Sequence, residues 1–324
     1  MNSSLNALQN CPSCNAPIKS SRFLFKILLL GELCLVLRCN QCSLVYKQLM
    51  PTSQGLQYIY SHSYIHFQES DSKFDLASEN SNKQKLDRCR HFLNPEIDTE
   101  AISVLDVGCG SGGFVKTARR MGYNAQGIDP YLPPQLHSEY LKPLSPQDLA
   151  GVSSFNIITL LNVVEHLDQP KVLFSQIYHL LKPGGLLLLT CPYGDSLALQ
   201  FHRQQWGHLA LDEHLLFWTP KSLTYLLRQV GFQGKFSYRI AGLPFPYGRV
   251  SITSERSTNE NVLDSTDSQS NSPNVPSCSR VSLQSKVWQM ARWTQRQEVV
   301  ANLARSLIHL THTGDYLEYL IRLN

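Results

Sequence analysis

The stretch VLDVGCGSGGF, residues 104–114, joins an apolar run to a segment with helical periodicity. The run at 102–107 is short and rich in β-branched residues, which predicts a buried strand. The glycines behind it allow a tight turn and a close approach to a ligand, and the next helix offers free N–H groups to an anion. Gly108, Gly110 and Gly113 also satisfy the G-x-G-x-x-G pattern of dinucleotide sites. The stretch therefore predicts a site for a ligand that carries a nucleoside, with a purely structural turn as the alternative.

Strands and helices alternate on both sides of this stretch. Further strands are predicted at 124–129, 155–161 and 186–191. One helix is predicted at 114–121. A second is expected to be capped by Asp168, and a third to start at Thr219-Pro220. Such an alternation is typical of a parallel sheet with helices on both faces.

The composition resembles that of ordinary globular proteins. Of the 324 residues, 42% are hydrophobic and 17% are charged, and the formal charge is +4. The chain has no run of Lys and Arg, so we expect no nucleic-acid surface. The most apolar stretch, 23–37, is shorter than a bilayer span and contains Lys26 and Glu32, so we expect buried strands there and no membrane span. No small-residue cleavage site follows the stretch, so we expect no signal peptide there, and the cytoplasm is the expected location.

Two C-x-x-C pairs stand near the start of the chain: Cys11 with Cys14, and Cys39 with Cys42. In an intracellular chain this pattern favours a metal over disulfides. Four thiolates form the closed tetrahedral site of a structural zinc ribbon, and metal binding would supply the folding free energy of so small a module. The alternatives are free cysteines and, since neither pair opens a helix after a strand, less readily a redox pair.

Four motifs together resemble the class I S-adenosylmethionine-dependent methyltransferases. They are VLDVGCGSGGF, GIDP (127–130), NVVEHLDQP (162–170) and LLKPGGLLLLTCP (180–192). The resemblance covers roughly 90–250 and implies an α/β fold with a Rossmann-like seven-stranded sheet, preceded here by the zinc ribbon. It also implies S-adenosyl-L-methionine as the cofactor.

Carried over by position, the resemblance implies a cofactor site around the glycine-rich stretch. Asp106 and the backbone of Gly108 to Gly110 would hold the methionine moiety, Asp129 the ribose hydroxyls, and Asn162 would lie beneath the methionine end. The candidate cofactor-binding residues are Asp106, Gly108, Cys109, Gly110, Gly112, Asp129, Pro130 and Asn162. Cys109 is expected to pack the loop rather than to react. The segment that usually carries an acidic residue near the adenine, here 143–154, departs from the common form and leaves Asp148 as the candidate.

The stretch ALDEHLLF, residues 210–217, places three ionisable groups between apolar neighbours. Methyl transfer requires that the acceptor be positioned and, where needed, deprotonated. Glu213-His214 followed by Phe217 resembles the stretch that carries the base in sugar C-methyltransferases, a subgroup that also has an N-terminal zinc-binding domain. Its members act on nucleotide-linked deoxysugars, and the ribbon is taken to help cover the substrate. His214, with Glu213, is therefore the candidate general base; alternatively, Asp212 caps a short helix and His214 is structural.

The expected domain organisation follows from these motifs. It comprises a zinc ribbon (1–50), a connecting or substrate-covering segment (51–90), the methyltransferase core (91–249), a disordered and then helical insertion (250–311), and a returning final strand (312–324). In the class I fold the last strand lies antiparallel between the fifth and sixth, and 235–241 is expected to be the sixth. The alternative is a C-terminal helix that forms a separate appendage.

The expected function is S-adenosylmethionine-dependent C- or O-methylation of a small-molecule acceptor, with a sugar as one candidate. One alternative is a quinone or lipid-like acceptor. Another is a zinc-ribbon module that binds RNA or protein and carries an inactive core. The sequence leaves the oligomeric state open.

Overall fold

The computed structural model describes residues 5–52, 54–56, 58–59, 76–149, 151, 154–209, 212–241 and 314–323. All of these residues belong to one compact unit. The expected disordered and then helical insertion at 250–311 lies outside the described residues, as does part of the segment 51–90. No helix in the described ranges combines the length and apolar character that a membrane crossing requires.

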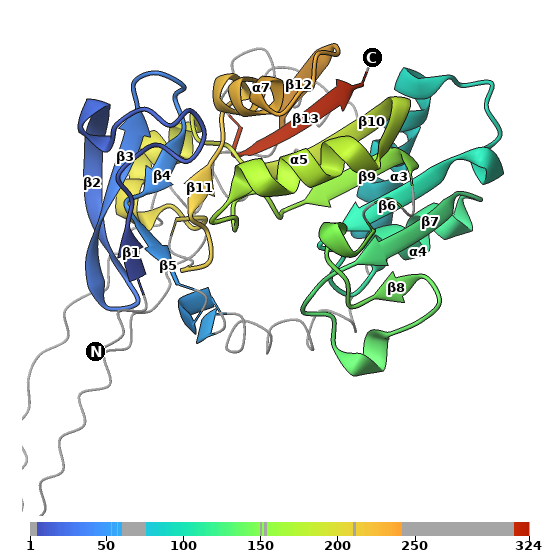
Figure 1. The fold of residues 1–324 in the computed structure, drawn as a ribbon, viewed down its shortest axis with the longest axis horizontal. Coiled ribbons are helices and arrows are strands. Elements are labelled where there is room, and N and C mark those ends of the chain that lie inside the picture. The colour runs from blue at the N-terminus through green and yellow to red at the C-terminus, as the bar shows by residue number, and fades with distance from the viewer. Residues whose placement is uncertain are drawn as a thin grey trace, which may run out of the picture. The chain divides into compact units, whose positions relative to one another are not determined.

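A seven-stranded sheet forms the larger part of the structure (Figure 1). Its strands are β6 Ser103–Val107, β7 Asn124–Ile128, β8 Leu141–Lys142, β9 Phe155–Leu161, β10 Leu181–Pro192, β12 Phe236–Ala241 and β13 Tyr316–Arg322. They are arranged in the order β12-β13-β10-β9-β6-β7-β8. The five strands from β10 to β8 run parallel, while β13 is antiparallel to both of its neighbours.

The last described strand, β13, lies inside the sheet although it is some seventy residues from β12 in the chain. Leu320 is opposite Leu188 in β10 and Ser237 in β12, and both leucines are buried. Glu318 is also buried, and it forms ion pairs with Arg88 and Arg239. This is the position and the direction that the strand order of the resembled fold predicts for the final strand.

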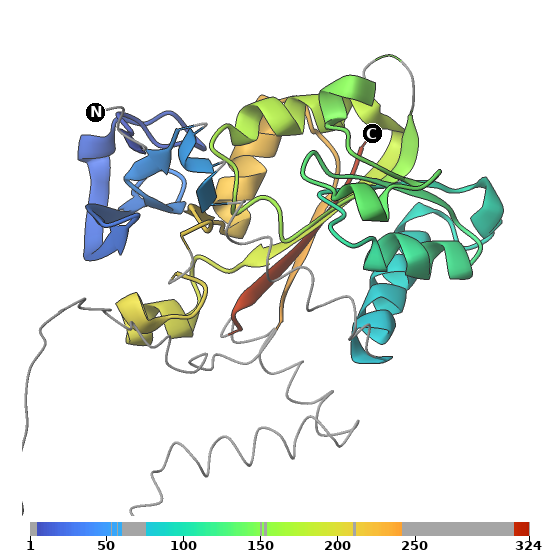
Figure 2. The same cartoon turned by 90° about the horizontal axis from the view of Figure 1, so that it is seen from below.

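Helices cover both faces of the sheet (Figure 2). They are α3 Leu76–Leu93, α4 Gly113–Arg120, α5 Pro170–Leu180 and α7 Pro220–Gln229, whereas α6 Leu197–His202 packs with strands of the N-terminal part of the structure. Phe114 and Val115 of α4 pack with α3 against one face, whereas Phe174 of α5 and Leu223 of α7 pack against the other. The layered α/β fold predicted from the alternation of strands and helices is therefore confirmed.

Two local predictions about helix ends differ in outcome. Helix α7 begins at Pro220, as predicted, and Thr219 caps it: its side chain accepts a hydrogen bond from the amide of Ser222, whose own side chain accepts one from the amide of Thr219. The N-cap of α5, however, is Gln169, without a side-chain hydrogen bond. The prediction that Asp168 caps α5 is therefore wrong, because the helix begins one residue later than the pattern suggested.

The N-terminal residues form two small sheets. Their strands are β1 Leu5–Ala7, β2 Ser21–Leu29, β3 Glu32–Cys39, β4 Val45–Lys47 and β5 Leu49–Pro51. β1 pairs with β5, and a four-stranded sheet has the order β11-β4-β3-β2. Its outer strand β11, Leu216–Phe217, comes from the ALDEHLLF stretch.

The apolar stretch 23–37 forms the β2–β3 hairpin, as predicted, but it is only partly buried. Val36 is inaccessible to solvent, whereas Leu28 and Leu33 near the turn are 69% and 61% exposed. The expectation of buried strands is therefore met only in part, because successive side chains of a strand point to opposite faces of the sheet and only some of them face the core.

Candidate functional site

The loop after β6 is built from left-handed glycines. Gly108, Gly110 and Gly112 have φ values of +72°, +51° and +78°. The amide of Gly108 donates to the carbonyl of Ile128 at the end of β7 (2.8 Å), which ties the loop to the neighbouring strand. A Cβ on Gly108 would lie 2.6 Å from a methyl group of Val163, so this position has neither the conformation nor the space for another residue.

Cys109 packs the loop against β7, as expected. Its side chain is 8% exposed, and a Cβ on Gly127 would lie 2.6 Å from the Cβ of Cys109. Burial raises the pKa of the Cys109 thiol well above its ordinary value, and the nearby carboxylates of Asp106 and Asp129 act in the same direction. The thiol therefore stays protonated and is not suited to act as a nucleophile.

Two carboxyl groups flank the loop at the ends of adjacent parallel strands. Asp106, on β6, is 3% exposed and accepts a hydrogen bond from Thr159 Oγ1 (2.6 Å). Burial raises the pKa of Asp106 to about 7, against the opposing effect of Thr159. Asp129, just after β7, accepts from the amides of Gly110 (3.1 Å) and Tyr131 (2.9 Å), yet burial still raises its pKa. The structure thus brings Asp106, Asp129 and the glycine loop together, as predicted for one ligand site.

The remaining cofactor candidates lie in three different segments after strands of the sheet. Asn162 follows β9 with φ +57°, and its side-chain oxygen accepts from Thr190 Oγ1 (3.0 Å). Pro130, next to Asp129, is exposed. Asp148 is exposed in a short 3-10 helix, where its carboxylate accepts from the amide (2.8 Å) and hydroxyl (2.7 Å) of Ser145. The carboxylate of Asp148 is therefore already bound within its own turn.

The DEH segment, Asp212 to His214, lies against the Glu165-His166 pair, so that two Glu-His pairs from distant parts of the chain meet. The amides of Leu215 and Leu216 both donate to the carbonyl of Glu165, at 2.8 and 3.0 Å. His166 and His214 are in edge-to-face contact, with ring centroids 4.8 Å apart. Asp212 lies in a turn rather than at a helix start, so the helix-cap alternative is wrong. The neighbouring Glu165 and His166 were not expected here, although the repeated EHL triplet in the sequence was a signal.

His214 is 6% exposed, and its Nδ1 donates to the carbonyl of His208 (2.7 Å). Burial lowers the pKa of His214 well below its ordinary value, and the neighbouring His166 and His208 lower it further. His214 is therefore neutral at physiological pH, with its Nε2 lone pair available.

The N-terminal sheet contributes a lysine to the same region. Lys47 on β4 is 1% exposed, and its amide donates to the carbonyl of Leu215 (3.0 Å). Burial lowers the pKa of Lys47 to about 8, while the charges of Asp212 and Glu213 act in the opposite direction. The N-terminal module and the DEH segment are therefore joined by backbone pairing and by charge.

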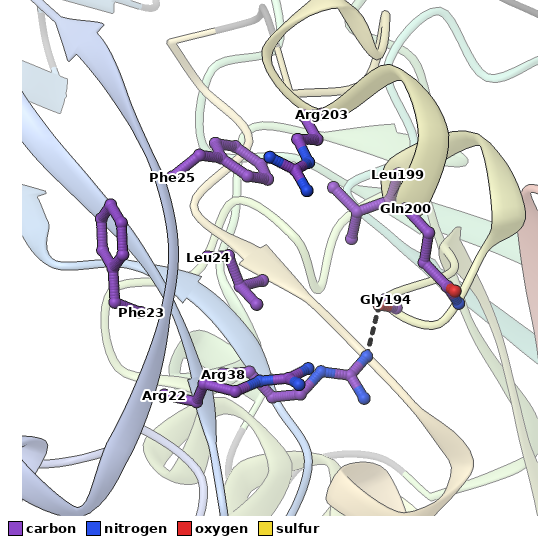
Figure 3. A pocket seen from close by; sticks show the side chains of 9 residues that line it. All are labelled: Arg22, Phe23, Leu24, Phe25, Arg38, Gly194, Leu199, Gln200 and Arg203. Atoms are coloured by element: carbon purple, nitrogen blue, oxygen red, sulfur yellow. Dashed lines mark hydrogen bonds between the residues drawn. The ribbon is translucent and has the colours of Figure 1, made fainter.

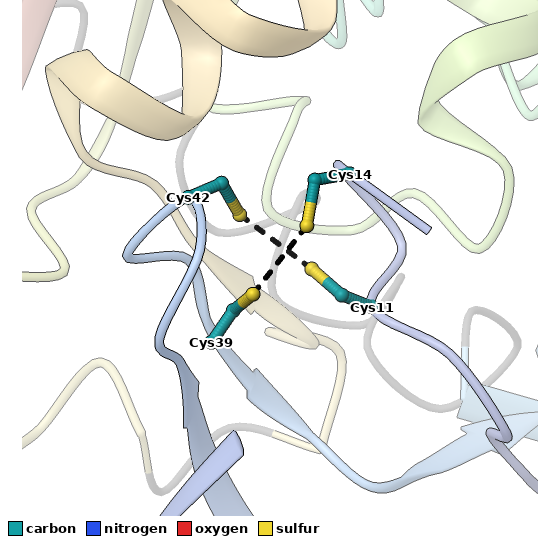
Figure 4. A group of neighbouring side chains, drawn as sticks. All are labelled: Cys11, Cys14, Cys39 and Cys42. Carbon is teal, nitrogen blue, oxygen red and sulfur yellow. Dashed lines mark hydrogen bonds between the residues drawn. The ribbon is translucent and has the colours of Figure 1, made fainter. Parts of the chain in front are cut away.

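The four cysteines of the C-x-x-C pairs converge on one point (Figure 4). Sγ of Cys11 lies 3.6 Å from that of Cys42, and Sγ of Cys14 lies 3.4 Å from that of Cys39. All four side chains are buried. Sulfur atoms bound tetrahedrally to one zinc ion, at about 2.3 Å each, would be roughly 3.8 Å apart. The sulfur atoms therefore fit a zinc ion with small adjustments.

A cavity of about 410 Å³ lies elsewhere, lined by residues of β2, β3, α6 and the segment after β10 (Figure 3). Arg22, Arg38 and Arg203 contribute to its wall. Arg38 donates to the carbonyl of Gly194 (3.0 Å) and forms an ion pair with Asp195. None of the cofactor candidates lines this cavity, so we assign the ligand site from the loop geometry instead.

The glycine loop lies within a segment that matches a known protein family. Residues 78–234 match the model of a family described as a methyltransferase domain. Curated relatives include the ubiquinone biosynthesis O-methyltransferases of Dinoroseobacter shibae (28% identity over 151 residues) and Xanthomonas oryzae pv. oryzae (32% over 123 residues). These matches cover 41% and 31% of this chain and 61% and 50% of the relatives, so the chain spans little more than half of their length.

Among solved structures, a SAM dependent methyltransferase from Archaeoglobus fulgidus is 15% identical, with a TM-score of 0.44 over 75% of this chain and 94% of that chain. The family match includes the glycine loop and both Glu-His pairs, but not the four cysteines.

Proposed function

We propose that this chain, which carries a class I S-adenosylmethionine-dependent methyltransferase domain, transfers the methyl group of S-adenosylmethionine to an oxygen of a small-molecule acceptor. The observation that supports this most is the arrangement of Asp106 and Asp129 on either side of a left-handed glycine loop, at the carboxyl ends of β6 and β7. Open α/β sheets bind ligands at this edge.

Each residue around the loop has a proposed role in cofactor binding. Among the described residues, the Asp129 carboxylate accepts two amide hydrogen bonds, and it retains lone pairs for two ribose hydroxyls. Asp106 would face the cationic methionine end, where a positive charge favours its ionised form. Asn162 would lie beneath that end, and Gly108 to Gly112 would leave room for the cofactor.

The bound cofactor supplies an electrophilic methyl group on a sulfonium. During transfer the acceptor oxygen forms a bond to this methyl as the sulfur–methyl bond breaks, and the acceptor hydroxyl loses its proton. The chain has to position the acceptor and provide for the proton. The assignment of His214 and Glu213 as the general base pair remains a prediction.

An oxygen acceptor is favoured by the names of the relatives, which are O-methyltransferases of ubiquinone biosynthesis. A phenolic or quinol hydroxyl is therefore the proposed acceptor class. A sugar acceptor is the second candidate, supported by the cysteine pairs and the DEH stretch. Incubation with methyl-labelled cofactor and a metabolite extract, followed by identification of the labelled product, distinguishes the two.

A structural zinc ion at Cys11, Cys14, Cys39 and Cys42 is part of the proposal. The convergence of four buried sulfur atoms supports it. The zinc would hold together the module that contributes Lys47 to the DEH region.

Calorimetry with S-adenosylhomocysteine tests the cofactor assignment. Gly110→Arg should abolish binding, because the new side chain fills the site. Gly31→Arg is the matched control, since Gly31 is also left-handed (φ +82°) but lies in the β2–β3 turn with no atom near its Cβ position. Equal affinity in the wild type and Gly110→Arg would refute the assignment, and no binding by the wild type would favour a binding module with an inactive core.

A further inference from the structure

The two Glu-His pairs bring together three side chains of the kind that bind metals. Glu165, His166 and His214 each offer a ligand atom, and these atoms all lie within 4.8 Å of one another. The three residues come from two segments of the methyltransferase domain, and none belongs to the cysteine cluster. The group is held in place by the backbone, because the carbonyl of Glu165 accepts from the amides of Leu215 and Leu216.

Both histidines have the same proton arrangement. Nδ1 of His166 lies 3.0 Å from the carbonyl of Glu213, and Nδ1 of His214 lies 2.7 Å from the carbonyl of His208. A carbonyl oxygen can only accept, so each Nδ1 carries the proton and each neutral ring keeps its lone pair on Nε2. Metal-binding histidines are commonly held in this way, with the second ring nitrogen donating to a carbonyl or carboxylate.

Glu165 would provide the negative charge when a cation binds. Its side chain is inaccessible to solvent, and neither carboxylate oxygen has a hydrogen-bond partner among the described residues. A buried carboxylate without a partner is unfavourable unless a cation or hydrogen bonds compensate for the lost water. The orphaned carboxylate lies beside two imidazoles, so a cation bound there would satisfy all three groups.

We propose that Glu165, His166 and His214 bind one divalent transition-metal ion. Two imidazoles and one carboxylate suit first-row ions and leave coordination positions open. Ligand atoms around such an ion are roughly 3 to 4 Å apart, for bonds of about 2.1 Å, so small side-chain rotations complete the site. The charge of Lys47 nearby is offset by Asp212 and Glu213, which act on it electrostatically.

An open coordination position would take an oxygen of the acceptor, an inference that rests on the proposed function. Metal binding itself does not rest on it. A bound ion would occupy the Nε2 lone pair of His214, so the same histidine could not also act as a free general base. The metal measurement therefore decides between these two roles.

The test is metal binding by the whole chain of 324 residues, loaded with zinc, in the absence of cofactor and acceptor. Mn²⁺ prefers oxygen and nitrogen ligands to thiolates, so its binding, followed by electron paramagnetic resonance, reports on this site and not on the cysteines. Zinc retention after incubation with excess Zn²⁺ and gel filtration is the second measurement. We expect one saturable Mn²⁺ site per chain and one zinc beyond the cysteine-bound ion.

Glu165→Gln should weaken Mn²⁺ binding at least tenfold and remove the additional zinc, while Glu139→Gln, a control at a carboxylate that is 80% exposed, should retain both. S-adenosylhomocysteine binding by each variant checks that the domain is folded, and it reports separately on the proposed function. Absence of both Mn²⁺ binding and additional zinc in the wild type would overturn the proposal. Equal metal binding by wild type and Glu165→Gln would overturn it as well.

Discussion

Replacing Asp106 by Asn should stabilise the cofactor-free protein at alkaline pH while weakening cofactor binding. Asp106 is 3% exposed, and Thr159 Oγ1 donates to it. Asn has nearly the same shape and can still accept that hydrogen bond, but it cannot ionise. The substitution therefore removes the cost of a buried charge and leaves the packing in place.

The magnitude follows from the pKa of Asp106, which burial raises from 3.8 to about 7. At pH values below 3.8, the pKa of this carboxyl in the unfolded chain, the group is protonated in both the folded and the unfolded state and costs no stability. As the pH rises above 3.8, the unfolded chain releases its proton first and the stability of the fold decreases. Above about pH 7, the pKa of Asp106 in the folded protein, the loss of stability is complete. A difference of about 3 pKa units corresponds to roughly 4 kcal/mol. We expect Asp106→Asn to exceed the wild type by about 4 kcal/mol at pH 8, but by only about 2 kcal/mol at pH 5.

Urea unfolding at pH 5 and pH 8, followed by circular dichroism, measures this difference. Other buried carboxyl groups with raised pKa values, such as Glu165, are common to both proteins and cancel. Asp148→Asn is the control, because the pKa of this exposed carboxyl is lowered by Ser145 and its removal should not stabilise the fold. Calorimetry should show S-adenosylhomocysteine affinity reduced by roughly ten- to a hundredfold in Asp106→Asn, the effect of one lost charge-assisted hydrogen bond. An unchanged stability difference between the two pH values would refute the reasoning.

Three further substitutions test other parts of the structure. Leu320→Ala, at a 1% exposed position in the strand between β10 and β12, should lower the free energy of unfolding by about 2 to 5 kcal/mol in urea unfolding; a loss below 1 kcal/mol would contradict the internal position of β13. Gly108→Ala should reduce both thermal stability and S-adenosylhomocysteine affinity, because φ is +72° and the new Cβ would meet Val163; wild-type values of both would speak against the loop geometry. Cys39→Ser should lose the zinc ion, measured as metal content per chain, and a preparation that keeps the full amount would disprove the four-cysteine site.

Local sequence patterns were sufficient for most elements of the sheet. The strand at 155–161 has the predicted bounds, and Gly231 follows α7 as expected. The final strand was predicted from a Gly-Asp turn and a run rich in Tyr, Leu and Ile, together with the order of strands in the resembled fold. These predictions succeed because a buried parallel strand needs a continuous apolar run and a helix needs an apolar stripe with a start and a stop. Errors occurred at boundaries and exposed edges, as at Asp168 and Leu28, where no packing enforces the local pattern.

The candidate site likewise has a part that the sequence predicted and a part that only the structure revealed. By itself the sequence determined the glycine loop, the carboxylates that end β6 and β7, and the two cysteine pairs, because each depends on residues that are close together in the chain. Only the tertiary structure decided that Glu165 and His166 meet His214, and that Lys47 of the N-terminal module reaches the DEH segment. These contacts join segments more than forty residues apart. They depend on which strand a two-residue segment such as β11 pairs with, and so short a segment has no periodicity that could specify its partner.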